Sequence, residues 1–578
     1  MDVTPYLDLN IAPRAVFDHL PTRRSRVRFM IPDGDDWRGI TWQAFADQIR
    51  AFGQFLLDLG INPGERVAIY SPNRVEWISA ALAIQSIGAV MVPIYPSSTA
   101  DQAAYILEHS DARAVFADTE MIVENLLRRW DGLKNVLRVI TFQENLAVTE
   151  LVKKLRAQGV EVPSQGEAEA KITAQCRALS LGKALDEESA ETFDRALLRV
   201  SLDQGAVMLY TSGTTGLPKG VPLTHRNIAV NGRDWLQCNA SLISENAVDL
   251  LWLPMSHIFG FGEACLGNTL GFTTYLADPA TVLQKLREVR PSVFMSVPRY
   301  FEKLVEMATQ KEGRGSKAER LREITGQEIT FALSGGAGLT KEVKDLFYEA
   351  GILIIEGYGL TEASPTLTLN RPDAFRFDTV GKPLPSVELK LASDGEILAR
   401  GESIFQGYHK DPAATAGTFT DDGWLKTGDL GKFTEDGFLQ IVGRKKEILV
   451  TAAGKNIAPV GIENHFVDDP YIAHLLVYGD GKRYLTAGVW INKETVIEAL
   501  GAEVTERGIR GLIEPRIEAV NAGLARYERI KTFVIIDSPL TIENGLLTPT
   551  LKIKRKKVYE AFEREFESLY TEAAEVRP

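Results

Sequence analysis

The chain has 578 residues, which at roughly 150 residues per domain allows three or four domains, or one large domain with a smaller companion. Apolar residues make up 45% and charged residues 25%, as in ordinary folded proteins, and this excludes general disorder. The 65 Lys and Arg residues and 77 Asp and Glu residues give a net charge of −12, which argues against nucleic acid as a partner. An anionic substrate would therefore need a local group of donors.

The cysteine pattern and the N-terminus indicate the compartment. Cys176, Cys238 and Cys265 are odd in number and far apart, which favours neither a disulfide framework nor a thiolate metal site. The N-terminus carries acidic residues and prolines where a signal peptide needs a basic start. The most apolar long stretch, 80–95, is shorter than the ~20 residues of a membrane span. We therefore expect a cytoplasmic protein, and peripheral contact with the inner membrane face is compatible with this expectation.

From about residue 40, short apolar runs alternate with amphipathic segments of helical length, a pattern typical of α/β proteins with parallel sheets. Strands are expected at 66–72, 90–95 and 113–118, with helices at 75–89 and 101–110. After residue 200 the pattern predicts strands at 206–210, 250–255, 272–278, 292–297, 329–334 and 352–359, and helices at 226–238, 281–289, 299–308 and 341–350.

The remaining segments suggest a division into domains. The stretch of about 140–200 is more charged and less periodic, so we interpret it as a linker or a helical insertion. From about 377 to 443, Asp-Gly pairs at 394–395, 422–423 and 436–437 predict hairpin turns and an antiparallel β subdomain. The composition then becomes more basic. We therefore expect an N-terminal domain over 1–443, a C-terminal domain over 444–578 and a hinge near 445.

The segment YTSGTTGLPKG, residues 210–220, directly follows an apolar strand. Its glycines, hydroxyl groups and lysine suit a loop that wraps polyphosphate oxygens. It does not match GxxxxGK[ST], which disfavours a kinase or ATPase of the P-loop class. A flexible surface linker is the less favoured alternative, because linkers seldom follow a buried strand. The candidate phosphate-binding residues are Thr211, Ser212, Gly213, Thr214, Thr215, Gly216 and Lys219.

This loop resembles the signature loop of the adenylate-forming superfamily, which contains acyl-CoA synthetases, adenylation domains of peptide synthetases and firefly-type luciferases. Seven further segments resemble family motifs in the family's order, and the fatty-acid CoA ligase branch fits best. They are VPIYPSSTADQAAYILEHSDARAVFAD (92–118), LPMSHIFG (253–260), LSGGAGL (333–339), EGYGLTEASP (356–365), GWLKTGDLG (423–431), IVGRKKEILVTAAGKNIAP (441–459) and NGLLTPTLKIKR (544–555). The resemblance implies doubly wound sheets in a large N-terminal domain and a small, mobile α/β C-terminal domain.

The segment EGYGLTE carries the expected metal and phosphate ligands. Glu362 offers hard oxygen ligands and Thr361 a hydroxyl donor, although a lone Thr-Glu pair is more often a helix start. By resemblance, Thr211 and Glu362 hold Mg²⁺, and Thr361 contacts the α-phosphate of ATP. The resemblance also implies that nucleotide contacts, including an adenine slot that begins at Ser334, come from Gly335, Gly336, Ala337, Glu356, Gly357 and Tyr358.

The resemblance assigns further roles along the chain. Asp429 would accept the ribose hydroxyls and Arg444 would add a second ribose contact, although an isolated aspartate between strands is usually a turn former. Lys446 matches the hinge position. For His257, positioning of the acyl carboxylate and a structural role at a strand end are both open. Gly335 would also contact the acyl group.

Lys552 occupies the position of the family's catalytic lysine, with Lys554 as the alternative. The usual Ser-Gly before this lysine is replaced here by Thr550-Leu551, as in long-chain members. Lys554, Arg555, Lys556 and Lys557 could form a solvated helix face or a patch for anionic membranes, and we favour the solvated face.

The implied reaction joins a carboxylic acid, such as a medium- or long-chain fatty acid, to ATP as acyl-AMP and then to coenzyme A as acyl-CoA. ATP, Mg²⁺ and coenzyme A would be the cofactors, and the protein would be a monomer or homodimer. Alternatives are an enzyme that uses acyl carrier protein as acceptor or stops at acyl-AMP, and a non-catalytic nucleotide-binding homologue.

Overall fold

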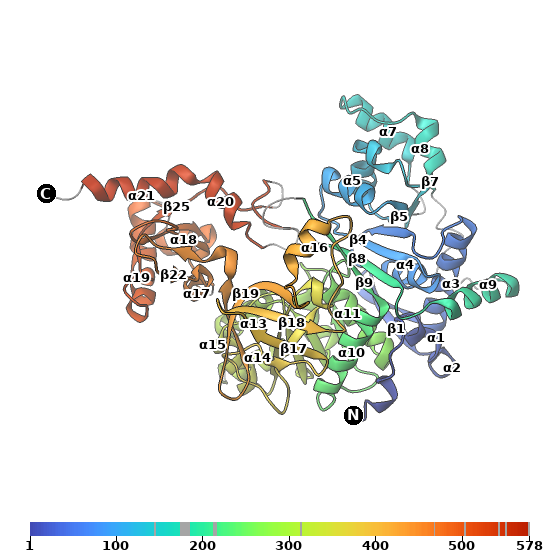
Figure 1. Ribbon diagram of the computed structural model, residues 1–578, viewed down its shortest axis with the longest axis horizontal. Coiled ribbons are helices and arrows are strands. Elements are labelled where there is room, and N and C mark those ends of the chain that lie inside the picture. Colours follow the sequence, from blue (N-terminus) through green and yellow to red (C-terminus); the bar gives the residue numbers. More distant parts are fainter. Residues whose placement is uncertain are drawn as a thin grey trace. The chain divides into compact units, whose positions relative to one another are not determined.

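The computed structural model describes residues 1–143, 146–173, 185–211, 217–311, 315–467, 469–501, 504–541, 544–548 and 552–575, with side chains as far as residue 570 (Figure 1). The chain forms two compact units. Unit one consists of residues 1–389, 399–425 and 435–439, and unit two consists of residues 390–398, 426–434 and 440–578.

Unit one contains a nine-stranded mixed sheet, in which β1 and β10 to β14 form a run of parallel neighbours. The pairs toward the two edges, β14 with β15, β15 with β16 and β1 with β2, are antiparallel. Parallel strands are covered on both faces, so they are apolar on consecutive residues, as in Phe331–Ser334, which is wholly buried. In spatial order the strands are β16 (Lys382–Pro383), β15 (Thr366–Leu369), β14 (Leu353–Gly359), β13 (Phe331–Ser334), β12 (Val293–Ser296), β10 (Val248–Leu251), β11 (Thr273–Leu276), β1 (Val27–Asp33) and β2 (Asp36–Thr41).

The second sheet of unit one has seven strands, parallel except at one edge, where β8 and β9 form an antiparallel hairpin (Figure 1). In spatial order the strands are β7 (Ile172–Thr173), β6 (Arg138–Thr141), β5 (Ala112–Ala117), β3 (Arg66–Tyr70), β4 (Val90–Ile94), β8 (Gly205–Thr211) and β9 (Lys219–Thr224). The sequence pattern does not reveal β9, which contains Pro222. An edge strand tolerates this proline because the missing N–H bond falls on the unpaired side.

Helices of unit one pack on these sheets. The most apolar stretch of the sequence forms α4, which is buried at every position except Glu76, together with β4. No helix among the described residues is long and apolar enough to cross a bilayer. The helices are α1 (Arg14–Phe17), α2 (Leu20–Arg23), α3 (Trp42–Asp58), α4 (Val75–Ser86), α5 (Ala100–His109), α6 (Glu120–Arg128), α7 (Val148–Ala157), α8 (Gln165–Lys171), α9 (Glu187–Arg199), α10 (His225–Asn239), α11 (Ile258–Leu270), α12 (Val282–Val289), α13 (Pro298–Gln310), α14 (Lys317–Ile324), α15 (Lys341–Glu349) and α16 (Pro412–Thr418).

A four-stranded sheet contributes residues to both units. Its order follows the chain, β17 (Val387–Leu391), β18 (Glu396–Gly401), β19 (Leu425–Phe433) and β20 (Leu439–Arg444). The three Asp-Gly pairs lie at tight turns, and Gly395, Gly423 and Gly437 have φ of +85°, +82° and +84°. Glycine adopts this left-handed region without steric cost, which explains the strength of the sequence signal.

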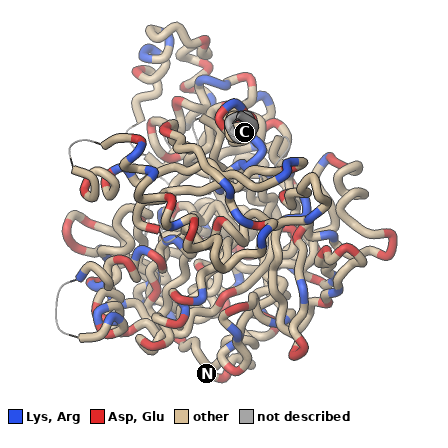
Figure 2. The backbone as a smooth tube through the Cα atoms, turned by 90° about the vertical axis from the view of Figure 1, so that its left-hand side faces the viewer, with Lys and Arg blue, Asp and Glu red and all other residues tan. Residues whose placement is uncertain are grey.

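The rest of unit two is an α/β structure with two hydrophobic clusters on either side of β23 to β25. Its strands are β21 (Leu449–Val450), β22 (Asn456–Ile457), β23 (Ile472–Tyr478), β24 (Leu485–Ile491) and β25 (Ile530–Ile535). Its helices are α17 (Pro459–Glu463), α18 (Lys493–Leu500), α19 (Glu506–Gly523), α20 (Arg555–Ala561) and α21 (Glu563–Glu575). Figure 2 shows acidic and basic residues interspersed along the tube, in keeping with the modest net charge of −12.

Candidate functional site

Several predicted site residues of unit one follow the carboxyl ends of neighbouring strands. His257 comes after β10, Gly335 after β13, and Thr361 after β14. The strands β13 and β14 are parallel, and Ser334 pairs with Glu356 in their register. Because ligands of open α/β sheets bind at this edge, the strand order brings the sequence-predicted loops to one side of the sheet.

The loop after β13 is held by a buried ion pair. The Lys344 ammonium donates to Oε2 of Glu356 at 2.5 Å, and the backbone N–H of Leu339 donates to Oε1 at 2.9 Å. Burial raises the pKa of Glu356, and the positive charge of Lys344 opposes this. Glu356 was expected among the nucleotide contacts, but its oxygens bind within the protein. We infer that it supports the loop of Gly335, Gly336 and Ala337.

Two positions at this edge of the sheet require glycine, one for a close backbone contact and one for its backbone conformation. A Cβ on Gly359 would lie 1.9 Å from the carbonyl oxygen of Pro365, so no other residue fits there. Gly336 is exposed and has φ of +89°, a conformation that favours glycine. Gly357 and Tyr358, also expected to contact the nucleotide, are half-buried in β14.

Thr361 and Glu362 begin the 3-10 helix η4 (Thr361–Ala363), and both are half-buried. The hydroxyl of Tyr408 donates to Oε1 of Glu362 at 2.8 Å. The Lys219 ammonium lies 4.8 Å from the centre of the same tyrosine ring. Tyr408 therefore brings the predicted phosphate-binding lysine and the predicted metal ligand together, and sequence reasoning missed it.

The predicted phosphate loop is the connection between β8 and β9, the two strands of the antiparallel hairpin. Thr211 pairs with Lys219 as the last residues of the ladder, and both are half-buried. Ser212, Gly213, Thr214, Thr215 and Gly216 lie outside the described residues. The loop therefore connects two antiparallel strands, whereas the sequence pattern suggested a strand followed by a helix.

His257 is the N-cap of α11. Its Nδ1 accepts a hydrogen bond from the backbone N–H of Phe259 at 3.1 Å. The imidazole is half-buried, and this bond fixes its tautomer with the proton on Nε2. His257 therefore has a structural role as the cap of α11. If it also binds an acyl carboxylate, it would do so through Nε2.

Unit two contains the remaining predicted residues. Nε of Arg444 lies 3.0 Å from Oδ1 of Asp429, whose side chain is 8% exposed. Desolvation and the positive charge of Arg444 lower the pKa of Lys552, and the Asp429 carboxylate opposes this. Asp429, Arg444 and Lys552 thus lie within electrostatic range of one another. Lys446 is exposed in the 3-10 helix η5 (Lys445–Glu447).

The basic run near the C-terminus is less uniform than expected. Arg555 is not on a solvated face, because its guanidinium forms hydrogen bonds of 2.7 and 2.6 Å with both carboxylate oxygens of Glu463. Lys556 and Lys557 are exposed. The pKa of Lys554 is lowered by burial and by Lys557, with no contribution from Asp429 or Arg444. Lys552, which is exposed, is therefore the lysine of this run whose pKa is influenced by Asp429 and Arg444.

Mg²⁺ prefers hard oxygen ligands. Among the described residues, no group of three or more His, Cys, Asp or Glu side chains could hold a metal ion. Glu362 and Thr211 supply hard oxygen atoms, and Mg²⁺ commonly binds through one or two protein ligands together with substrate phosphates. Glu362 and Thr211 therefore fit a Mg²⁺ ion that is bound by the protein together with the phosphates of a substrate.

Two family profiles cover most of the chain. The profile described as "AMP-binding enzyme" matches residues 17–409, and the one described as "AMP-binding enzyme C-terminal domain" matches residues 446–574. The chain belongs to the AMP-binding enzyme family. The predicted membership of the adenylate-forming superfamily is thereby confirmed.

This AMP-binding enzyme is similar to curated ligases along its length. It is 33% identical to the long-chain-fatty-acid–CoA ligase FadD15 of Mycobacterium bovis, over 92% of each chain. It is 27% identical to long-chain-fatty-acid–CoA ligase 5 of Rattus norvegicus, over 92% of this chain and 84% of the rat protein.

Solved structures share the fold of this AMP-binding enzyme. The adenylation domain of a carboxylate reductase from Mycobacterium chelonae matches with a TM-score of 0.78 and 22% identity, over 98% of this chain and 93% of that one. The anthranilate CoA ligase AuaEII in complex with anthranoyl-AMP matches with a TM-score of 0.75 and 20% identity, over 97% and 99%. The predicted α/β fold class is confirmed.

Proposed function

We propose that the protein is an ATP-dependent fatty acid–CoA ligase that acts on medium- or long-chain acids through an acyl-AMP intermediate. The observation that carries this proposal is the 33% identity to a long-chain-fatty-acid–CoA ligase over 92% of both chains. Two groups of contacts support it: Tyr408 links Glu362 and Lys219 in unit one, and Asp429, Arg444 and Lys552 influence one another in unit two.

The reaction has two steps. An oxygen of the fatty acid carboxylate bonds to the α-phosphorus of ATP, and the bond from this phosphorus to the bridging oxygen breaks, so that pyrophosphate leaves. The sulfur of coenzyme A then bonds to the acyl carbonyl carbon, the carbon–oxygen bond to AMP breaks, and the thiol proton is released. No covalent enzyme nucleophile is needed, so positioning and charge stabilisation provide the catalysis.

The residues of unit one would bind the nucleotide. Thr361 would donate to an α-phosphate oxygen, and Lys219 would bind the polyphosphate chain. Thr211 and Glu362 would hold Mg²⁺, which when bound neutralises phosphate charge. The glycine-rich backbone after β13, with Tyr358, would form the adenine slot.

The residues of unit two would act on the ribose and the reacting phosphate. Asp429 would accept the ribose hydroxyls, with Arg444 as a second contact. The Lys552 ammonium would bridge the substrate carboxylate and the phosphate oxygens during the first step. Lys446 would be the hinge residue of a C-terminal domain that begins near residue 444 and presents a different surface in the second step.

The test is product analysis. The protein is incubated with MgATP, a panel of fatty and aromatic acids, and either coenzyme A, acyl carrier protein or no acceptor, and the products are identified by mass spectrometry. Acyl-CoA from fatty acids is the expected product. Acyl transfer to carrier protein alone, or accumulation of acyl-AMP with every acceptor, would assign the alternative activities, and absence of pyrophosphate would indicate a non-catalytic homologue.

The same proposal includes a cytoplasmic location, peripheral membrane contact and a monomeric or homodimeric state. Arg555 forms an ion pair with Glu463. Lys554, Lys556 and Lys557 would therefore be the residues that contact an anionic membrane. Sedimentation with vesicles of 30% phosphatidylserine tests the membrane contact, and light scattering gives the oligomeric state. Failure to bind at physiological salt would remove membrane contact from the proposal.

A further inference from the structure

Helix α5 forms hydrogen bonds to the residues that directly precede Thr211 and Lys219. The hydroxyl of Tyr105 donates to the carbonyl oxygen of Pro218 at 3.0 Å. One turn later, Nδ1 of His109 lies 2.8 Å from the hydroxyl oxygen of Tyr210. Tyr210 directly precedes Thr211, and Pro218 directly precedes Lys219. A single helix face therefore holds both strands where the ladder of the hairpin ends.

Ring packing fixes the geometry of these two bonds. The rings of Tyr105 and His109 are stacked, with centroids 5.2 Å apart and planes at 25°. The ring of Tyr210 stands edge-on to both, at 6.4 Å from Tyr105 and 5.7 Å from His109. Burial and the nearby Lys410 ammonium lower the pKa of His109, which favours the neutral imidazole. The contact is thus a packed aromatic cluster with two directed hydrogen bonds.

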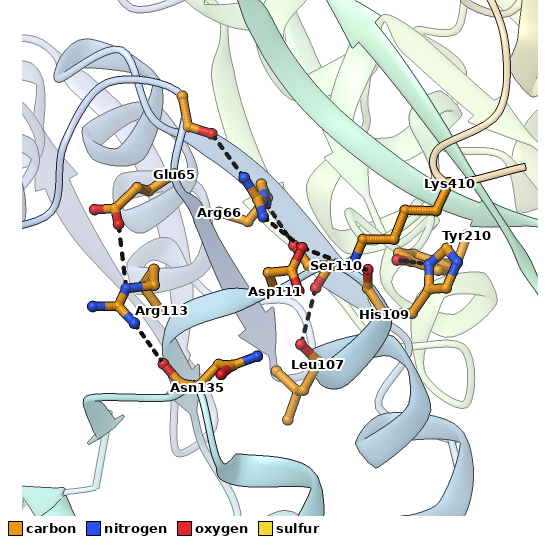
Figure 3. Close-up of polar contacts among 11 residues, drawn as sticks. Glu65, Arg66, Leu107, His109, Ser110, Asp111, Arg113, Asn135, Tyr210 and Lys410 are labelled. Carbon is orange, nitrogen blue, oxygen red and sulfur yellow. Dashed lines mark hydrogen bonds and ion pairs between the residues drawn. The ribbon is translucent and has the colours of Figure 1, made fainter.

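The C-terminal end of α5 is itself held in place (Figure 3). The Lys410 ammonium donates to the carbonyl oxygen of His109 at 2.9 Å and lies 2.7 Å from the Asp111 carboxylate. Arg66 lies 2.9 Å from the same carboxylate and donates to the carbonyl oxygen of Ser110 at 2.5 Å. These partly exposed ion pairs contribute little stability individually. Their backbone bonds nevertheless fix where His109 stands relative to β8.

A second connection runs from β9 to the same segment. The backbone N–H of His409 donates to the carbonyl oxygen of Gly220 at 2.9 Å, and the ring of His409 lies 5.4 Å from that of His109. The segment that carries Lys410 is therefore attached to β9 on one side and to α5 on the other. The hairpin, the helix and this segment form one connected group within unit one.

The hairpin end needs such support. Thr211 and Lys219 are the last paired residues of β8 and β9, and the ends of strands open more readily than their centres when nothing else holds them. Pro218 has no N–H, so its carbonyl oxygen is the one backbone hydrogen-bonding group it offers. A ligand that binds Thr211 and Lys219 when both are already held in place does not lose binding free energy to ordering them.

We propose that Tyr105 and His109 are positioning residues for ATP, which act through Pro218 and Tyr210 to hold Lys219 and Thr211 ready for the polyphosphate. This inference rests on the proposed function, in which those two residues contact the phosphate chain or its metal ion. A tyrosine hydroxyl can also be satisfied by a carbonyl oxygen merely as part of ordinary packing. If the two residues position the phosphate contacts, their substitution should weaken the binding of ATP but not of AMP. If they serve packing alone, their substitution should affect the binding of both nucleotides equally or of neither.

The test compares ATP with AMP. Dissociation constants of both nucleotides are measured by calorimetry for the wild type and for Tyr105→Phe, which keeps the ring and removes one hydrogen bond. ATP should bind about two- to tenfold more weakly, the range that one hydrogen bond supports, while AMP binding stays unchanged. Formation of thioester from presynthesised acyl-AMP should also remain at the wild-type rate. Tyr300→Phe is the matched control, because the Tyr300 hydroxyl donates to the carbonyl oxygen of Pro279 at 2.9 Å.

His109 provides the second pair of variants. His109→Phe should reproduce the selective loss of ATP affinity, whereas His109→Asn, whose amide can occupy the place of Nδ1, should restore most of it. Equal weakening of ATP and AMP in Tyr105→Phe and His109→Phe, or no change in either, would overturn the inference. Failure of the wild type to bind ATP would overturn the proposed function itself, and the two failures are thereby distinguished.

Discussion

The hydroxyl of Tyr408 donates to Oε1 of Glu362, and the ring of the same tyrosine lies against the Lys219 ammonium. Burial and the adjacent carboxylate raise the pKa of Tyr408, so the phenol stays protonated and acts as the donor. One oxygen of Glu362 is thus oriented by the protein, and in the proposed function the carboxylate would also bind Mg²⁺.

Tyr408→Phe removes this bond while it keeps the ring under Lys219. We expect kcat/KM for pyrophosphate formation to fall about tenfold or more, since a hydrogen bond to a charged group contributes roughly 1.5–3 kcal/mol. Pyrophosphate release at varied MgATP measures the effect. Tyr6→Phe is the control, because Tyr6 donates to Glu245 at 2.7 Å on an exposed surface. Wild-type kinetics in Tyr408→Phe would show that the bond does not orient the site.

Glu362→Gln replaces the expected metal ligand with a neutral amide, a poorer ligand for a hard cation. Pyrophosphate formation should fall at least roughly a hundredfold, which corresponds to about 3 kcal/mol. The rate is measured from limiting to saturating Mg²⁺. A mutant that matches the wild type across this range would remove Glu362 from the metal site.

Lys552→Ala should lower acyl-adenylate formation by roughly a thousandfold, about 4 kcal/mol of transition-state stabilisation. With presynthesised acyl-AMP and coenzyme A, the same variant should form thioester at a rate near that of the wild type. Lys554→Ala is the matched control, because its side chain lacks the electrostatic influence of Asp429 and Arg444. The reverse result, with Lys554 required and Lys552 dispensable, would shift the catalytic assignment by two residues.

His225 predicts a dependence of stability on pH. It is buried at the start of α10, and desolvation lowers its pKa from 6.5 to about 4. The unfolded chain therefore binds a proton more readily than the folded one, so stability falls as the pH drops through 6.5 toward 4. Between pH 7 and pH 5, His225 should lower the free energy of unfolding by about 2 kcal/mol.

Urea unfolding at several pH values, monitored by fluorescence, measures this dependence. His225→Leu should reduce the loss of unfolding free energy between pH 7 and 5 by about that amount, whatever its effect on absolute stability at pH 7. An unchanged slope in the variant would show that His225 does not titrate within this range.

Much of the fold could be predicted from the sequence, because each parallel strand and its following helix are local patterns. The Asp-Gly turns and the strand before the phosphate loop were found in this way. The strand β9 was missed, since Pro222 and Gly220 are unfavourable in a strand and only the edge position next to β8 makes them tolerable.

His257, Gly335 and Thr361 lie at strand ends that the sequence motifs mark, whereas Asp429 lies within β19. Tyr408 and Lys344 could not be found in the same way, because their significance comes from partners that are distant in the chain. Tyr408 lies 46 residues from Glu362, and Lys344 appears on an amphipathic helix as one charge among several. Arg555 was misjudged for the same reason, since the run of basic residues gives no sign of its pairing with Glu463.

The chain crosses between its two units five times, after residues 389, 398, 425, 434 and 439. A gene divided at residue 446, where the C-terminal family profile begins, would therefore separate residues 390–398, 426–434 and 440–445 from the rest of unit two. The fragment that carries Lys552 would lack Asp429 and Arg444, which would stay together in the other fragment. Domain exchange with a relative or division into fragments would thus keep all of unit two, with Asp429, Arg444 and Lys552, on one piece only if the boundary lay before residue 390.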